Sequence, residues 1–321
     1  MYDKPLTLGA CRDWRHGRRA GSVIAMPGDQ PIADLTDLVA PLSADEFDAL
    51  LAARETRHFA GNAGDAARYA ALLDWDGLVE GVRDGRFAPP DLRLMRDRAK
   101  VPPMFLRGDA AQRTELVDKV LAADASIILN RAERHVPALG RLCAAIAGGT
   151  RDHVSAVAIA TAGQGGALDL HYDDYDIMVL QVAGAKTWFI HPDPVPNPVE
   201  GLPHDPPADP AAPPALTITL QPGDRLFVPA GWRHRCETVG GRSLHLGILF
   251  YPFTATRAAE LILREMLKAP DDRAPLRFGD AAAAATEAAL RRRLIDRIEA
   301  TPLAELIRLH RASGAQPDAD G

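Results

Sequence analysis

The stretch that decides the fold runs from His171 to Trp188 and has the sequence HYDDYDIMVLQVAGAKTW. Its apolar runs, 176–182 and 186–191, have the composition of strands, and the Ala-Gly-Ala between them predicts a hairpin. Since side chains two residues apart on a strand point to the same side, we expect His171 and Asp173 to reach a common centre. The stretch therefore predicts a β structure that carries two polar ligands on one side.

Four further strand-like runs surround this stretch, at 154–160, 216–220, 225–228 and 243–250. In the first of them, Val157 and Ile159 alternate with alanines that belong to the opposite face. The runs are separated by turns rich in Gly and Pro rather than by helices. This pattern favours an antiparallel sandwich or barrel.

Both flanks of the β region show helical periodicity. Ser43 and Glu46 have the spacing of a capping box, in which each side chain accepts a backbone hydrogen bond from the other residue. N-terminal to the β region, helices are expected over 65–75, 77–84, 112–122 and 137–147, with a short strand at 126–129. C-terminal to it, helices are expected from 254 to about 298 and over 302–313, with an apolar stripe typical of a core or an oligomer interface.

The chain is divided accordingly. We expect a flexible tail at 1–33, a helical part at 34–150, a β core at 151–252, a second helical region at 253–314 and a disordered tail at 315–321. With 47% hydrophobic and 25% charged residues, the chain can bury a substantial core. A net charge of -6 argues against a nucleic-acid partner.

The cysteines and the N-terminus indicate the compartment. Cys11, Cys143 and Cys236 lie far apart and form no CxxC pair, which points to a reducing environment rather than to a disulfide framework. Met1 is not followed by an apolar run, and no segment has the length of a membrane span. A cytoplasmic protein without a membrane partner is therefore expected.

A third ligand is needed to complete a metal site. One imidazole and one carboxylate are two parts of the triad that binds non-haem Fe(II), and a second histidine is required. His234 supplies it, after the Pro222-Gly-Asp turn, a strand and a second tight turn. Three protein ligands would leave room for bidentate 2-oxoglutarate and O2. His245 competes with His234, but a buried, hydrogen-bonded core histidine is the better interpretation.

Lys186 begins the second apolar run of the deciding stretch. If it faces inward it needs an anionic partner, and the far carboxylate of 2-oxoglutarate would provide one. A strand-end lysine that reaches solvent is an equally good interpretation. After this run, residues 192–214 contain ten prolines, which excludes a sheet interior and predicts an exposed loop. The loop is either a surface excursion or a cover over a substrate.

Three blocks of this sequence resemble the motifs of bacterial cupin-type JmjC proteins, whose relatives include the ribosomal oxygenases. The blocks are 171–188, 222–234 and 243–246, and the similarity extends over roughly 34–252. The resemblance implies a double-stranded β-helix of the jelly-roll type, followed by helices that often mediate dimerisation. It also implies that His171, Asp173 and His234 bind Fe(II) and that Lys186 pairs with the C5 carboxylate of 2-oxoglutarate.

Two departures from the ribosomal oxygenases bear on the substrate. Val157 and Ile159 stand where those enzymes usually have an Asn and a Tyr, so the pocket is more apolar. The residues after Pro252 also show no strand-bearing winged helix. Both departures concern the surroundings of the iron rather than its ligands.

The resemblance implies a dioxygenase that hydroxylates a peptide or protein side chain while 2-oxoglutarate and O2 yield succinate and CO2. Such a protein is expected to be a homodimer through its C-terminal helices. Demethylation of N-methyl-lysine and tailoring of a ribosomal peptide or small natural product use the same metal chemistry and stay open. A non-enzymatic cupin-like binding protein is the alternative from another class.

Overall fold

The computed structural model describes residues 30–96, 99–150, 152–164, 166, 168–199, 212–275 and 283–312. The α-helices are α1 Leu35–Val39, α2 Ala44–Ala53, α3 Ala63–Ala70, α4 Trp75–Arg83, α5 Ala110–Leu121, α6 Pro137–Gly149, α7 Ala255–Lys268, α8 Ala283–Ala300 and α9 Leu303–Ala312. The strands are β1 Arg57–Phe59, β2 Leu92–Arg96, β3 Ala99–Lys100, β4 Ala125–Leu129, β5 His153–Ala162, β6 Asp176–Ile190, β7 Leu216–Leu220, β8 Arg225–Val228 and β9 His234–Tyr251.

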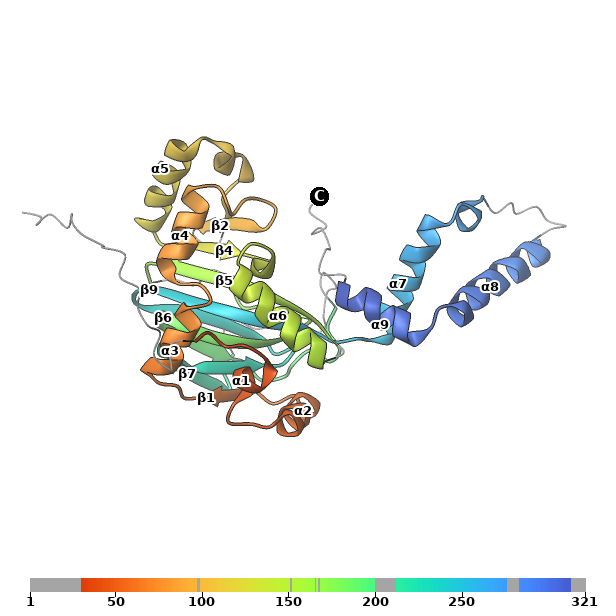
Figure 1. Cartoon of the computed structure of the whole chain (residues 1–321), viewed down its shortest axis with the longest axis horizontal. Coiled ribbons are helices and arrows are strands. Elements are labelled where there is room, and N and C mark those ends of the chain that lie inside the picture. The colour runs from red at the N-terminus through yellow and green to blue at the C-terminus, as the bar shows by residue number, and fades with distance from the viewer. Residues whose placement is uncertain are drawn as a thin grey trace, which may run out of the picture.

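The strands form one antiparallel sheet in the order β1-β8-β6-β9-β5-β4-β2-β3, with β7 added to β6. The long strands β6 and β9 pair along their whole length, from Asp176 opposite Phe250 to Ile190 opposite His234. Helices lie before and after this core in the chain (Figure 1). The predicted antiparallel β core with helical flanks is confirmed.

The predicted hairpin at 183–185 is wrong. Both halves of β6 pair with the same strand, β9, so the chain continues through a β-bulge instead of reversing. At the bulge Gly184 has φ +61°, and a Cβ there would lie 1.9 Å from the carbonyl oxygen of Arg242. Gly184 is therefore needed because the two backbones approach closely. In the sequence alone, a glycine at such a position looks the same as a glycine in a turn.

The two faces of the sheet pack against different partners. Ala156, Ala158 and Ala160 face the helices in one large buried cluster, and α6 lies against β5 (Figure 1). Val157 and Ile159 face the opposite way, into a smaller cluster between the strands. The predicted alternation along this strand is confirmed, and it separates a structural face from the face that carries the polar site.

Most N-terminal helices begin at a side-chain cap. The predicted capping box of Ser43 and Glu46 is present at the start of α2, and Asn62 and Asp109 cap α3 and α5 in the same way. The helices expected at 77–84, 112–122 and 137–147 are found within a few residues of these bounds. The helix expected at 65–75 ends earlier, at Ala70, and β1 and β2 were not predicted.

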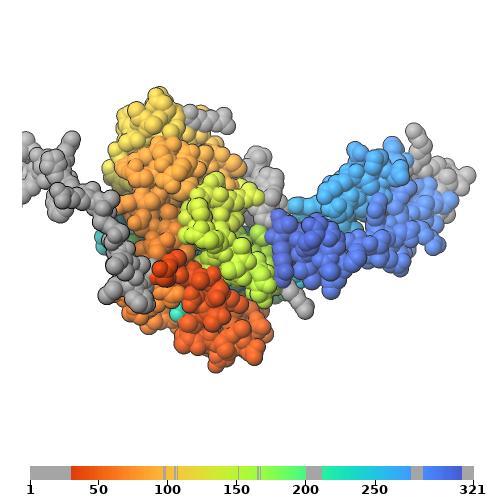
Figure 2. All heavy atoms as spheres, viewed as in Figure 1, coloured from red at the N-terminus to blue at the C-terminus, as the bar shows by residue number. Residues whose placement is uncertain are grey.

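Helices α7, α8 and α9 form an arm that projects from the β core (Figures 1 and 2). Its base is fixed by His310 of α9, whose Nε2 lies 2.8 Å from the carbonyl oxygen of Tyr251 at the end of β9. Helix α8 contacts α7 and is bonded through Arg293 and Arg297 to Asp271 and Asp272, but it buries none of its described residues in this chain.

Among the helices that the structure describes, none combines the length and the apolar character needed to cross a bilayer. Cys143 and Cys236 are free thiols, and Cys11 lies outside the described residues. The tail predicted at 315–321 and most of that at 1–33 also lie outside them. The cytoplasmic location stays a prediction.

Candidate metal centre

His171 and His234 face each other across an isolated antiparallel bridge. They exchange both backbone hydrogen bonds, with 3.1 Å from His171 N to His234 O and 2.7 Å from His234 N to His171 O. Directly paired residues carry their side chains on the same face, and the two ring centroids are 4.4 Å apart. Backbone pairing between distant parts of the sequence therefore brings the two imidazoles together.

Each imidazole is oriented through its Nδ1 atom. In His171 this atom lies 2.8 Å from the carbonyl oxygen of Asp169, and in His234 it lies 2.9 Å from that of Trp232. A carbonyl oxygen only accepts, so Nδ1 carries the proton and Nε2 keeps its lone pair. Burial, with His171 as the second cause, lowers the pKa of His234 to about 4. The His234 imidazole is therefore neutral at physiological pH.

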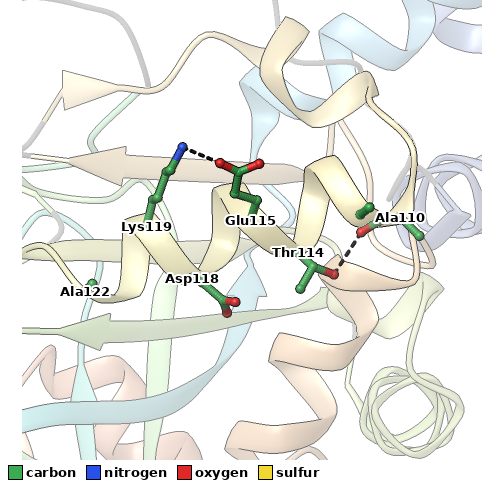
Figure 3. A pocket seen from close by; sticks show the side chains of 7 residues that line it. Ala110, Thr114, Glu115, Asp118, Lys119 and Ala122 are labelled. Carbon is green, nitrogen blue, oxygen red and sulfur yellow. Dashed lines mark hydrogen bonds and ion pairs between the residues drawn. The ribbon is translucent and has the colours of Figure 1, made fainter.

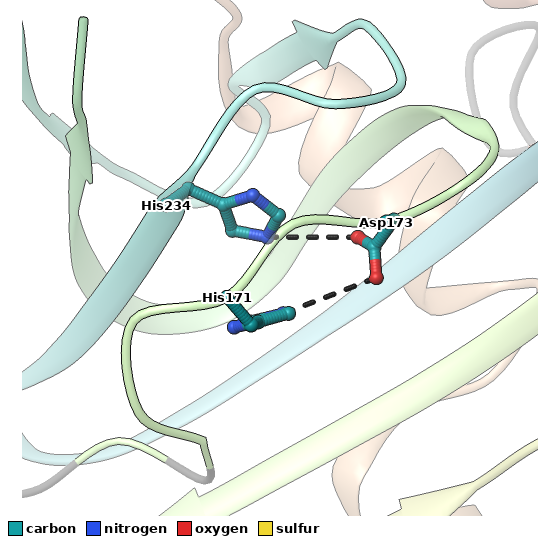
Figure 4. A group of neighbouring side chains, drawn as sticks. All are labelled: His171, Asp173 and His234. Atoms are coloured by element: carbon teal, nitrogen blue, oxygen red, sulfur yellow. Dashed lines mark ion pairs between the residues drawn. The ribbon is translucent and has the colours of Figure 1, made fainter. Parts of the chain in front are cut away.

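Asp173 faces both Nε2 atoms (Figure 4). Its Oδ1 lies 4.0 Å from Nε2 of His171 and its Oδ2 lies 3.6 Å from Nε2 of His234. One donor atom from each of the three side chains lies within 4.8 Å of the other two. The three side chains expected to meet at one centre do so.

The main chain that holds these candidate ligands differs from the expected strand. His171 occupies an isolated bridge, and Asp173 lies in the connection before β6. The N–H of Gly231 donates to the Asp173 carbonyl oxygen at 2.8 Å. Asp173, which was expected to lie on a strand with His171, is instead held by a tight turn before β9.

The chemistry of this donor set fits non-haem Fe(II). Two imidazoles and one carboxylate form the 2-His-1-carboxylate arrangement, which occupies one side of an ion and leaves the other positions open. The His234 side chain is 5% exposed, that of Asp173 is 17% exposed and that of His171 is 30% exposed. Access from solvent is therefore on the side of His171.

Lys186 points into the protein and is fully buried. Its Nζ lies 3.3 Å from Oγ1 of Thr161 and 3.4 Å from Nδ1 of His245. Burial lowers the pKa of Lys186, and its hydrogen-bond partners among the described residues are neutral groups rather than carboxylates. A buried ammonium held only by neutral groups is poorly compensated, and it is suited to receive an anionic ligand.

Two neighbours of Lys186 were not identified as site residues from the sequence. Thr161 lies on β5, and its Oγ1 is also 2.9 Å from Oγ of Ser126 on β4. His245 lies on β9 and is 2% exposed, so the predicted buried, hydrogen-bonded histidine is confirmed. Thr161 shares its face with Val157 and Ile159, so strand alternation was the one signal that could have found it.

Trp188 lies between His234 and His245. Its ring stacks on the ring of His234, with the ring centroids 5.5 Å apart, and it meets the ring of His245 edge-on at the same centroid distance. It belongs to the inner apolar cluster with Val157 and Ile159. The polar groups of the site are thus set in an apolar wall, as Val157 and Ile159 implied.

The first part of the proline-rich segment borders the site. Val195 donates its N–H to the carbonyl oxygen of Gly231 at 2.9 Å, and Arg233 donates to that of Asp193 at 2.6 Å. Residues 192–199 are therefore attached to the turn that precedes His234. Residues 200–211, which make up much of the predicted loop, lie outside the described residues.

A shallow hollow lies elsewhere, on the exposed side of α5 (Figure 3). Alanines line much of it, and its polar groups include the exposed ion pair of Lys119 with Glu115. A surface pair of this kind contributes little binding energy. The hollow therefore carries no chemistry comparable to that of the triad.

Comparison with known proteins gives the same assignment of fold. Residues 132–258 match the family model of the JmjC domain. A stretch of 84 residues is 38% identical to human "Ribosomal oxygenase 1" and covers 25% of this chain and 13% of that protein. A stretch of 106 residues is 33% identical to "Bifunctional lysine-specific demethylase and histidyl-hydroxylase NO66" of Aedes aegypti. It covers 28% of this chain and 17% of that protein. The matches thus span less than a fifth of these relatives.

The fold is also similar to that of a solved structure, Escherichia coli ycfD. The TM-score is 0.52 with 14% sequence identity, over 84% of this chain and 70% of that chain. At this identity the likeness concerns the fold alone. It supports the JmjC/cupin architecture of the β core.

Proposed function

This chain is a JmjC domain protein related to the ribosomal oxygenases, and from this we propose that it is an Fe(II)- and 2-oxoglutarate-dependent oxygenase. His171, Asp173 and His234 are proposed to bind the iron, and Lys186 the C5 carboxylate of 2-oxoglutarate. The observation that carries the proposal is the presence, in one site, of a group of two histidines and an aspartate and of a buried lysine that is hydrogen-bonded to the neutral groups Thr161 and His245. A degenerate cupin-like binding protein has no need to keep both.

The residues have separate roles in this mechanism. Bound Fe(II) supplies O2 activation, coupled to the decarboxylation of 2-oxoglutarate to succinate and CO2. Lys186 and Thr161 hold the far end of the cosubstrate, so that its 2-oxo acid end is directed at the triad. Trp188 stacks on His234 and restricts the ring. The apolar wall of Val157 and Ile159 keeps water from the reacting groups.

We propose a peptide or protein side chain as the substrate and hydroxylation as the reaction. The support is the relationship to proteins whose names denote oxygenation of ribosomes and hydroxylation of histidyl residues. Demethylation of N-methyl-lysine is the second candidate, because one relative is also named as a lysine-specific demethylase. Tailoring of a ribosomal peptide or small natural product uses the same centre.

The oxygenase is tested by reconstituting the purified protein with Fe(II) under anaerobic conditions, adding 2-oxoglutarate and O2, and measuring succinate. Succinate formation above a metal-free control is expected even without substrate, because such enzymes turn over slowly when uncoupled. Mass spectrometry of proteins from wild-type and deletion strains then separates hydroxylation from demethylation, which also releases formaldehyde. A protein that binds metal but forms no succinate would be a cupin-like binding protein.

We further propose that the arm of α7, α8 and α9 pairs with the arm of a second copy. Among its described residues, the large exposed apolar side chains are Leu263, Leu267, Leu294, Ile295, Ile298 and Leu303. Such a group is unusual on a monomer and typical of an interface. Helix α8, in which none of the residues with a described burial is buried, would gain a further packing partner in the dimer.

Replacing Ile295 and Ile298 together by glutamate is expected to convert a dimer into a monomer. Ile295 is 52% exposed and Ile298 is 59% exposed, so the change costs the isolated chain little but places charges in an apolar interface. Multi-angle light scattering measures the mass. Arg292→Glu, on the same helix and also exposed, is the matched control that should stay dimeric. A wild-type monomer at micromolar concentration would contradict the arm's proposed role.

A further inference from the structure

The turn at 229–233, between β8 and β9, is hydrogen-bonded to two of the three candidate metal ligands. The N–H of Gly231 donates to the carbonyl oxygen of Asp173 at 2.8 Å, and the carbonyl oxygen of Trp232 lies 2.9 Å from Nδ1 of His234. The first contact fixes the main chain of Asp173, and the second fixes the imidazole ring of His234. A shift of this turn would therefore move two donor atoms of the metal centre together.

The C-terminal end of α2 is bonded to the same turn. Nη2 of Arg54 donates to the carbonyl oxygen of Ala230 at 2.6 Å, and Nε1 of Trp232 donates to the carbonyl oxygen of Arg54 at 2.9 Å. Arg54 directly follows α2, and its N–H donates to the carbonyl oxygens of Leu50 and Leu51. One residue at the end of a helix thus makes a side-chain bond and a main-chain bond to the turn.

The bond from Arg54 to Ala230 belongs to the stronger kind, because its donor is charged. Its acceptor is on a residue that is only 4% exposed. The N–H of Ala230 donates to Oδ1 of Asp176 at 2.8 Å, so this residue is held through both its N–H and its carbonyl group. A turn makes few hydrogen bonds within itself, and contacts of this kind decide where it lies.

We propose that Arg54 is a positioning residue, which holds the turn at 229–233 in the place that directs Asp173 and His234 at a bound metal ion. This inference rests on the proposed function of the triad as the metal site. Arg54 acts through the turn rather than on a ligand side chain. The helical part of the chain that precedes the β core thereby has a role at the metal centre.

The test is Arg54→Met, which removes the guanidinium group and keeps an unbranched side chain. Co(II) is titrated into the metal-free protein by calorimetry, without 2-oxoglutarate or O2, and the visible absorption of bound Co(II) is recorded. We expect Co(II) affinity to fall about 10-fold and the absorption bands to shift, because loss of an outer partner changes ligand geometry. Arg54→Lys can still donate a charged hydrogen bond to Ala230 and should regain most of the affinity.

Arg57→Met is the matched control, because Arg57 is an exposed arginine on the neighbouring strand β1. It should bind Co(II) like the wild type. If Arg54→Met fails to fold, Trp232→Phe tests the same link, since it removes the Nε1 donor and keeps an aromatic ring. It should likewise weaken Co(II) binding and shift the bands.

A residue that only stabilises the fold would lower the melting temperature and leave affinity and spectrum unaltered. That result in Arg54→Met, with wild-type binding intact, would overturn the positioning role alone, and so would an equal loss in Arg57→Met. A wild type that binds no Co(II) would instead overturn the metal site itself.

Discussion

His234→Ala and Asp173→Ala are each expected to abolish succinate formation and to remove tight metal binding. Each variant leaves two of three ligands, and the donor atoms that now lie within 4.8 Å of one another no longer surround an ion. We expect a loss of at least about 10³-fold in turnover, on the order of the loss when an essential group is removed from an active site. Succinate release and calorimetric titration with Fe(II) or Co(II) measure the two effects.

Asp174→Ala is the control for these variants. Asp174 is the neighbouring carboxylate in the same segment but is not part of the group of candidate ligands. It should keep metal binding and succinate formation close to the wild type. If His234→Ala or Asp173→Ala turned over 2-oxoglutarate at the wild-type rate, the assignment of the triad would be wrong.

Lys186→Met is expected to weaken 2-oxoglutarate binding by about 30-fold or more, since removing one partner of a buried charge pair costs 2–5 kcal/mol. The same variant should melt at a higher temperature than the ligand-free wild type. The reason is that the fully buried ammonium of Lys186 has Thr161 and His245 as hydrogen-bond partners, both neutral, and Met fills similar space without a charge. Binding titrations and thermal unfolding with and without 2-oxoglutarate measure both effects.

The extra stability of Lys186→Met over the ligand-free wild type depends on pH, and the direction of this dependence follows from the pKa of Lys186. Burial lowers the pKa of Lys186 in the folded state, so the unfolded chain binds more protons and the wild type gains stability as pH rises. The advantage of Lys186→Met is therefore fully present below the folded-state pKa. It is lost as pH rises from there to the unfolded value near 10.4.

Lys119→Met serves as the control, because Lys119 is an exposed lysine in a surface ion pair with Glu115. It should change neither 2-oxoglutarate binding nor the melting temperature noticeably. If Lys186→Met were strongly destabilised and bound 2-oxoglutarate normally, Lys186 would be a structural residue and not the cosubstrate anchor.

Much of the architecture could be predicted from local patterns. The capping box at Ser43, the helix that starts at Pro137 and the two faces of β5 follow from side-chain spacing, which depends only on near neighbours. The hairpin at Gly184 was predicted wrongly because that prediction also used only near neighbours in the sequence. A glycine at a bulge and a glycine in a turn have the same local sequence, and only the partner strand β9 distinguishes them.

The sequence by itself determined which groups can act as ligands, because His171, Asp173 and His234 stand in a recognisable order and spacing. It also determined the β core, since alternation and turn residues are local properties. Only the tertiary structure decided that His171 pairs with His234 and that Lys186 points inward beside Thr161 and His245. Burial and hydrogen bonding between strands far apart in the chain arise only when the sheet has formed, so no local pattern contains them.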